Sequence, residues 1–97
     1  MDKAAVWKRI DVLRDALAWS LEHNRLLTWG QRVYINMERS AWQRELDWNK
    51  INPDYVMKAN YIVPGEIESK IRQISALIKS SGYDRSNYER QYINQWS

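Results

Sequence analysis

Residues 65–82 read GEIESKIRQISALIKSSG, and this stretch decides the fold class. Its aliphatic side chains recur every three or four residues, which places them on one face of a helix: Ile67, Ile71, Ile74, Leu77 and Ile78. Glu66 and Glu68 stand at its start and Lys79 near its end, which suits the helix dipole. Gly82 is suited to a left-handed cap. The pattern predicts an amphipathic helix over about 65–81.

A helical segment is predicted over about 3–25, with Asp2 as its N-cap. One face carries an aliphatic stripe: Val6, Ile10, Leu13, Leu17 and Leu21. A flanking arc adds Ala5, Val12, Ala16 and Trp19. Because the combined apolar arc is broad, we expect this helix to pack against two neighbours.

Another helix is predicted over about 29–48, because Thr28 and Gln31 match a capping box. Val33, Met37, Ala41 and Trp48 lie along one face, and Ile35, Trp42 and Leu46 along a second. At such spacing the aromatic residues fit core positions better than ligand-stacking ones: Tyr34, Trp42 and Trp48. Two long helices with a short link form an αα-hairpin.

The helical period fails over about 49–64, which predicts a long irregular loop containing both prolines, Pro53 and Pro64. Val63-Pro64-Gly65 is a free-looking tripeptide that a prolyl isomerase could recognise, whereas the simpler interpretation has Pro64 open the next helix. A short C-terminal helix is predicted over about 87–96. The chain is thus expected to be one all-α domain, a small helical bundle over 1–97.

The aromatic composition is skewed: six Trp, six Tyr and no Phe. Trp and Tyr join a large apolar body to a polar handle and are enriched at interfaces, so the composition indicates a binding protein. With 15 basic and 12 acidic residues interleaved, the net charge of +3 gives no phosphate-binding stripe, and direct DNA binding is not expected. No cysteine, signal peptide or membrane span is evident, which favours a cytoplasmic protein without membrane contact.

No set of residues indicates a catalysed reaction, so we expect that the protein is not an enzyme and binds no cofactor and no metal. His23 is the only histidine, which rules out a histidine-pair metal site. Asp54 with Glu68-Ser69-Lys70 matches the acid-x-Lys pattern of metal nucleases. That element lies on a strand in those enzymes, whereas here it lies in a predicted helix.

Four side chains are the candidate anchors for a partner, because each falls on a polar face or near the C-terminus: Trp7, Arg14, Arg39 and Trp96. Trp7 could instead fold over Asp11 and Arg14 of its own helix.

The chain resembles the second anti-RecBCD accessory proteins of P22-like bacteriophages in its length, its helical organisation and its Val63-Pro64-Gly65 loop. The resemblance covers the whole chain and rests on general character. It implies a protein without chemistry of its own that binds the host RecBCD helicase-nuclease, chiefly through the RecC subunit. It also implies that DNA-end processing is inhibited or redirected in favour of phage recombination, in the host cytoplasm. A host cyclophilin-type prolyl isomerase is implied as a companion, with Pro64 as its site and Pro53 as the fallback.

Two alternatives remain from the residues alone. A small helical nucleic-acid-binding protein or regulator would bind DNA in a strongly salt-dependent way. A metal nuclease would depend on Asp54 and Glu68.

Overall fold

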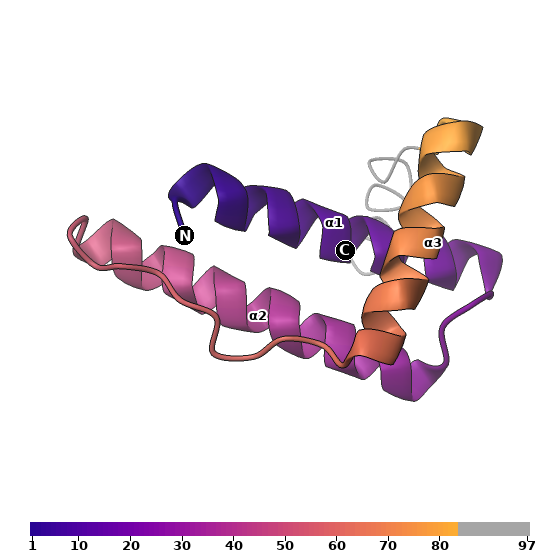
Figure 1. Cartoon of the computed structure of the whole chain (residues 1–97), viewed down its shortest axis with the longest axis horizontal. Helices are drawn as coiled ribbons and strands as arrows, with labels where there is room; N and C mark the ends of the chain where they lie inside the picture. The colour runs from indigo at the N-terminus through magenta and orange to yellow at the C-terminus, as the bar shows by residue number, and fades with distance from the viewer. Residues whose placement is uncertain (84–97) are drawn as a thin grey trace, which may run out of the picture.

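The computed structural model describes residues 1–83, and within them the chain is all-helical, as predicted. The described elements are α1 (Lys3–His23), α2 (Trp29–Ile51) and α3 (Gly65–Ser81). The helix predicted over 87–96 and the candidate anchor Trp96 lie outside the described residues. α1 and α2 run side by side as the predicted hairpin, and α3 crosses near the end where they are linked (Figure 1).

The predicted helix starts are confirmed by their hydrogen bonds. The Asp2 side chain accepts from the Ala5 amide at 2.8 Å, which caps α1. Thr28 and Gln31 make both bonds of a capping box at the start of α2. These side chains satisfy amides that the first helical turn leaves unpaired.

The helix ends depend on backbone conformation. Gly82 adopts φ of 69° and donates its amide to the Ile78 carbonyl, as expected for a left-handed cap of α3. α2 continues to Ile51, three residues beyond the predicted 48. The residue before a proline avoids helical backbone, so Asn52 before Pro53 sets the end of α2.

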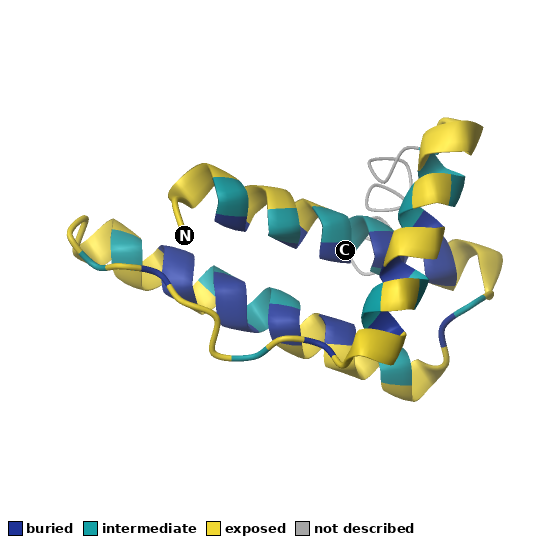
Figure 2. Cartoon of the chain, viewed as in Figure 1, coloured by how far each residue is buried: buried dark blue, intermediate teal, exposed yellow. Residues whose placement is uncertain are grey.

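α1 is the central helix, and both α2 and α3 pack against it. This confirms the two neighbours expected from its broad apolar arc. The buried side chains line the inner surfaces of the three helices (Figure 2). Trp42 and Trp19 are the largest core residues, at 2% and 3% exposure.

The predicted core placement of the aromatic residues of α2 is wrong for two of three residues. Trp42 fills the core as expected, but Tyr34 and Trp48 are exposed. Val33 and Met37, which share a face of α2 with Trp48, are also exposed, whereas Ala41 of the same face is buried. The reason is that α2 packs on α1 mainly through the face of Ile35, Trp42 and Leu46, which leaves Val33, Met37 and Trp48 at the surface.

The segment 52–64, here called the strap, returns from the end of α2 to the start of α3 along the outside of α2 (Figure 1). It has no helix or strand, as predicted. Met57 and Val63 nevertheless bury their side chains in the core. The strap is therefore a packed part of the fold.

Candidate functional site

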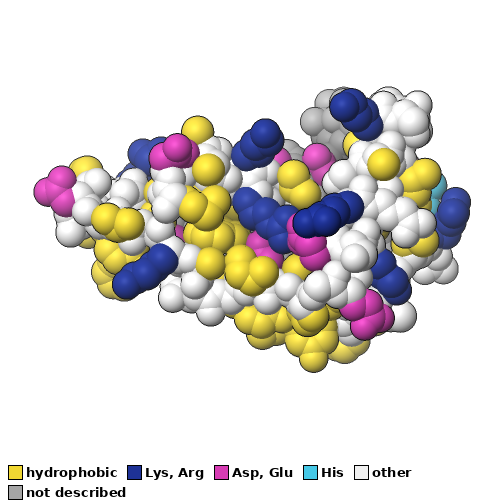
Figure 3. Space-filling view, in the orientation of Figure 1, with side chains coloured by type: hydrophobic (Ala, Val, Ile, Leu, Met, Phe, Trp, Pro, Cys, Tyr) yellow, Lys and Arg dark blue, Asp and Glu magenta, His cyan; other side chains and the backbone are white. Residues whose placement is uncertain are grey.

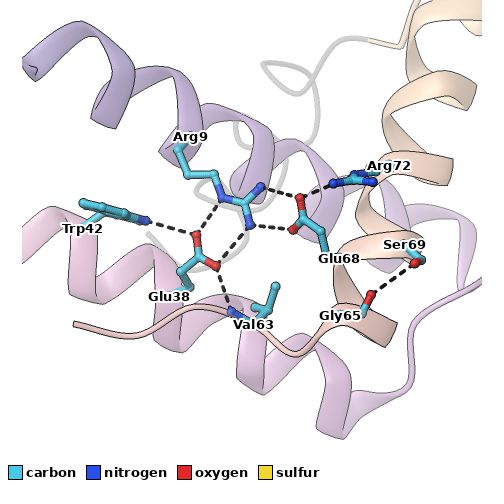
Figure 4. A network of polar contacts seen from close by, with 8 residues as sticks. All are labelled: Arg9, Glu38, Trp42, Val63, Gly65, Glu68, Ser69 and Arg72. Atoms are coloured by element: carbon cyan, nitrogen blue, oxygen red, sulfur yellow. Dashed lines mark hydrogen bonds and ion pairs between the residues drawn. The ribbon is translucent and has the colours of Figure 1, made fainter. Parts of the chain in front are cut away.

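A network of charged side chains joins all three helices (Figure 4). Arg9 of α1 forks onto Glu38 of α2, with Nε donating to Oε2 at 2.7 Å and Nη2 to Oε1 at 3.1 Å. The same guanidinium donates to both carboxylate oxygens of Glu68 in α3, at 3.1 and 2.7 Å. Arg72 lies 3.9 Å from Glu68 on the solvent side. One arginine thus connects two carboxylates from different helices.

Glu38 is fully buried and fully satisfied. Besides Arg9, the Trp42 indole donates to Oε2 and the Val63 amide to Oε1, both at 3.0 Å. Burial alone raises the pKa of Glu38, but these hydrogen bonds and the charge of Arg9 outweigh it and hold the pKa below its ordinary value. Burial also lowers the pKa of Arg9, while its two carboxylate partners raise it above the usual range. With four N–H donors on its two oxygens, the Glu38 carboxylate serves to hold the three helices and the strap together.

A second buried acid, Glu45, fastens the strap. Its carboxylate accepts the Tyr55 hydroxyl at 2.9 and 3.0 Å and the Lys58 amide at 3.0 Å. The hydrogen bond from the Tyr55 hydroxyl to Glu45 raises the pKa of Tyr55. Asn49, one turn further, donates to the Tyr55 carbonyl at 2.9 Å. The strap is therefore held by side chains of α2 along its length.

The sequence analysis missed these roles. A signal was present, because the spacing of the four residues places them on one face of α2 with an aromatic core residue among them: Glu38, Trp42, Glu45 and Asn49. Acidic residues that share a helix face with a core tryptophan are expected to be buried with it.

α2 also has an apolar face that is exposed to solvent. Trp29 is 74% exposed, and Val33 and Met37 follow it at four-residue spacing. Together with Leu17 and Leu21 of α1 they line a shallow groove of about 470 Å³. Figure 3 shows hydrophobic side chains gathered along the lower edge of the molecule, where α2 and the strap run. Exposed apolar side chains that lie together make this groove a candidate binding site.

A second groove continues the first along α2. It shares Asn36 and Met37 with the first and reaches Arg44 of α2 and Tyr61 of the strap. We call the two together the α2 groove. Its walls come from α1, α2 and the strap, so the tertiary structure assembles it.

The structure places three of the predicted anchors along the seam between α1 and α2. Trp7 is 43% exposed and lines a shallow pocket with Gln43 and Asp47 of α2. Arg14 lies two turns further along the same face of α1. Burial, and then the positive charge of Arg14, lower the pKa of Arg39.

The predicted isomerase loop is only partly exposed. Pro64 and Gly65 face solvent, but Val63 is 4% exposed and its amide is bound to Glu38. The tripeptide is therefore not free, although the sequence suggested that it would be. α3 begins at Gly65, and the Pro64 carbonyl accepts from the Ile67 and Glu68 amides at 3.0 Å, so Pro64 is the N-cap and not the first helical residue.

The residues with possible chemistry are kept apart. Glu68 is paired with Arg9, Lys70 donates to Gln31 at 3.1 Å, and Asp54 lies in the turn after α2. His23 stacks on the Trp19 ring with 4.4 Å between ring centroids. No group of three or more His, Asp or Glu side chains that could hold a metal occurs in residues 1–83.

Comparisons with known proteins do not assign the chain. No family model, curated protein or solved structure matches it. In the part of the chain that is described, none of the helices has the length and apolar character to span a membrane. The α2 groove and the seam between α1 and α2 are therefore the candidate functional surfaces.

Proposed function

We propose that the protein is a non-enzymatic interaction protein that acts by binding another protein. The observation that carries the proposal is the α2 groove, where Trp29, Val33 and Met37 expose a continuous apolar surface. Aromatic anchors surrounded by apolar and arginine side chains supply most of the energy in protein interfaces. The rigid attachment of the strap supports the same view, because a preorganised surface loses less entropy on binding.

The proposed partner is the host RecBCD helicase-nuclease, with RecC as the contacted subunit. The resemblance to phage anti-RecBCD proteins in length, helical organisation and the Val63-Pro64-Gly65 loop supports this choice. On this proposal the protein inhibits or redirects DNA-end processing in the host cytoplasm, in favour of phage recombination. Trp7, Arg14 and Arg39 along the seam contribute further contacts.

A pull-down tests this function. Tagged protein is incubated with bacterial lysate treated with nuclease, washed at moderate salt, and the retained proteins are identified by mass spectrometry. Purified RecBCD then replaces the lysate in a direct titration. We expect RecBCD to be retained in both steps. Loss of all binding after nuclease treatment, with nucleic acid retained before it, would replace this proposal by a nucleic-acid-binding function.

A cyclophilin-type prolyl isomerase is proposed as a second partner at Pro64, with Pro53 as the fallback. Both prolines are exposed, and Pro64 stands at the junction of the strap with α3.

The variants Pro64→Ala and Pro53→Ala separate the two positions. We expect Pro64→Ala to abolish capture of the isomerase and Pro53→Ala to leave it unchanged. Circular dichroism of both variants should retain the wild-type helix content, because neither proline lies inside a helix. Isomerase capture that survives both substitutions would rule out Pro64 and Pro53 as its site, and absence of capture by the wild type would rule out an isomerase partner.

A further inference from the structure

The burial of two glutamates leaves the part of α2 before Leu46 with surface charges of one sign; Asp47 is the next acidic residue and is exposed. Between Trp29 and Leu46 the acidic residues of α2 are Glu38 and Glu45, exposed by 0% and 2%. Both carboxylates are occupied by Arg9 and by the strap. The arginines of the same stretch stay at or near the surface without a carboxylate from their own helix: Arg32, Arg39 and Arg44.

The charge within the α2 groove is likewise positive. Among the side chains that line its two parts, the charged ones are Arg32 and Arg44. They lie 12 residues apart on one helix, which corresponds to about 18 Å. Trp29, Val33 and Met37 occupy the apolar floor at successive turns. The groove thus has an apolar centre and a cationic group toward each end.

We propose that the α2 groove binds an acidic amphipathic helix of a protein partner. A helix of slightly more than about three turns matches the separation of the two arginines. Its apolar face packs on Trp29, Val33 and Met37, and acidic side chains on its flanks pair with Arg32 and Arg44. The inference specifies the chemistry of the partner and rests on the proposed function only in that the partner is a protein.

A nucleic acid fits the groove less well. Base recognition in single strands needs aromatic platforms at successive positions and a cationic track for the phosphates. Here one wall consists of the aliphatic residues Leu17 and Leu21, and the two arginines stand far apart.

Two synthetic peptides test the proposal with the full chain. Both are helical, about 18 residues long, with the same leucine face. One carries glutamates on its flanks and the other carries lysines at the same positions. Fluorescence anisotropy of the labelled peptides measures their affinity. We expect the acidic peptide to bind at least about tenfold more tightly, with the preference reduced by salt.

Charge reversal in the protein provides the decisive control. In the double variant Arg32→Glu with Arg44→Glu, the preference should reverse toward the lysine peptide. Arg44→Glu alone should reduce it, which guards against a structural effect at Arg32, whose guanidinium also donates to the Leu27 carbonyl. The matched double variant Lys8→Glu with Lys79→Glu changes exposed lysines outside the groove and should behave as wild type.

Equal affinity for the two peptides, or no binding of either, would overturn the proposal. Tighter binding of a thymidine oligonucleotide would assign the groove to nucleic acid. A dimer in sedimentation that is lost in Trp29→Ala would assign it to a second copy of the chain. RecBCD capture is measured in parallel. If the double variant Arg32→Glu with Arg44→Glu still captures RecBCD as the wild type does, this inference alone is overturned. If the protein prefers the acidic peptide but does not capture RecBCD, only the proposed partner is removed.

Discussion

At the residue scale, Glu38 has the most constrained environment in the described chain. Its two oxygens face four N–H donors from α1, α2 and the strap, and none of its surface reaches solvent. A buried carboxylate is costly without partners, and here the partners come from three parts of the fold. Glu38 therefore links α2 to α1 and to the strap, and the stability of the fold is expected to depend on this link.

The variant Glu38→Gln tests this dependence. The glutamine amide would turn N–H groups toward neighbours that are themselves donors, and Arg9 would lose a partner for its charge. We expect the free energy of unfolding to fall by about 3 kcal/mol, as measured by urea denaturation. Glu22→Gln, at an exposed position of α1, should change it by less than about 0.5 kcal/mol.

The same carboxylate should also make stability depend on pH. Because the folded-state pKa of Glu38 is lowered, its contribution is complete above the ordinary value of about 4.5 and is lost as the pH falls through the lowered pKa. The difference in unfolding free energy between the wild type and Glu38→Gln should therefore shrink on acidification in that interval. A difference that stays constant with pH would contradict the assigned role of the charge.

At the scale of elements, the two ends of α3 carry glycines with different demands. Gly82 has φ of 69°, whereas Gly65 is the first residue of the helix and has ordinary backbone. A Cβ at either position would meet no atom within 4 Å. The two positions differ only in backbone conformation, so steric contact does not enter the comparison.

The pair Gly82→Ala and Gly65→Ala uses this difference. We expect Gly82→Ala to lower the unfolding free energy by about 1 kcal/mol, because alanine resists left-handed backbone. Gly65→Ala should leave it unchanged or raise it by up to about 1 kcal/mol, because the unfolded chain loses freedom. Thermal denaturation of both variants gives the comparison. Equal destabilisation would contradict the left-handed cap.

At the scale of the whole molecule, α1 is the hub, and α2 is left with one face for the core and another for solvent. The exposed tryptophans of α2 stand at its two ends, Trp29 in the groove and Trp48 beyond it. Trp29 therefore lies within the proposed interface, and Trp48, exposed on the same helix, lies outside it.

We expect Trp29→Ala to weaken partner binding by about 2 kcal/mol, or about 30-fold in Kd, with little change in stability. Trp48→Ala is the matched control and should bind as wild type. Calorimetric titration of each variant against purified RecBCD measures the effect. Trp7→Ala, measured alongside, reports whether the interface extends along the seam. Equal affinity of Trp29→Ala and the wild type would exclude the groove from the interface.

The sequence by itself determined the elements. Helix-period stripes, capping residues and the two prolines predict α1, α3, the αα-hairpin and the irregular strap within a few residues, because these features depend on neighbours one turn apart. Among the described helices, only α2 was predicted too short. Its apolar pattern ends near Trp48, whereas the helix continues to Ile51, where the backbone restriction before Pro53 ends it.

Only the tertiary structure decided which apolar face of α2 is buried and where its charges point. Two faces of α2 are apolar enough to pack, and the choice depends on α1 and on the partners of Glu38 and Glu45, which lie 10 to 29 residues away along the chain. That choice buries the acids, exposes Trp29, Val33 and Met37, and so creates the cationic, apolar groove. Periodicity within one segment carries no information about contacts over such separations, which is why the groove was not predicted from the sequence; Trp7, Arg14 and Arg39 stay predictions as partner anchors.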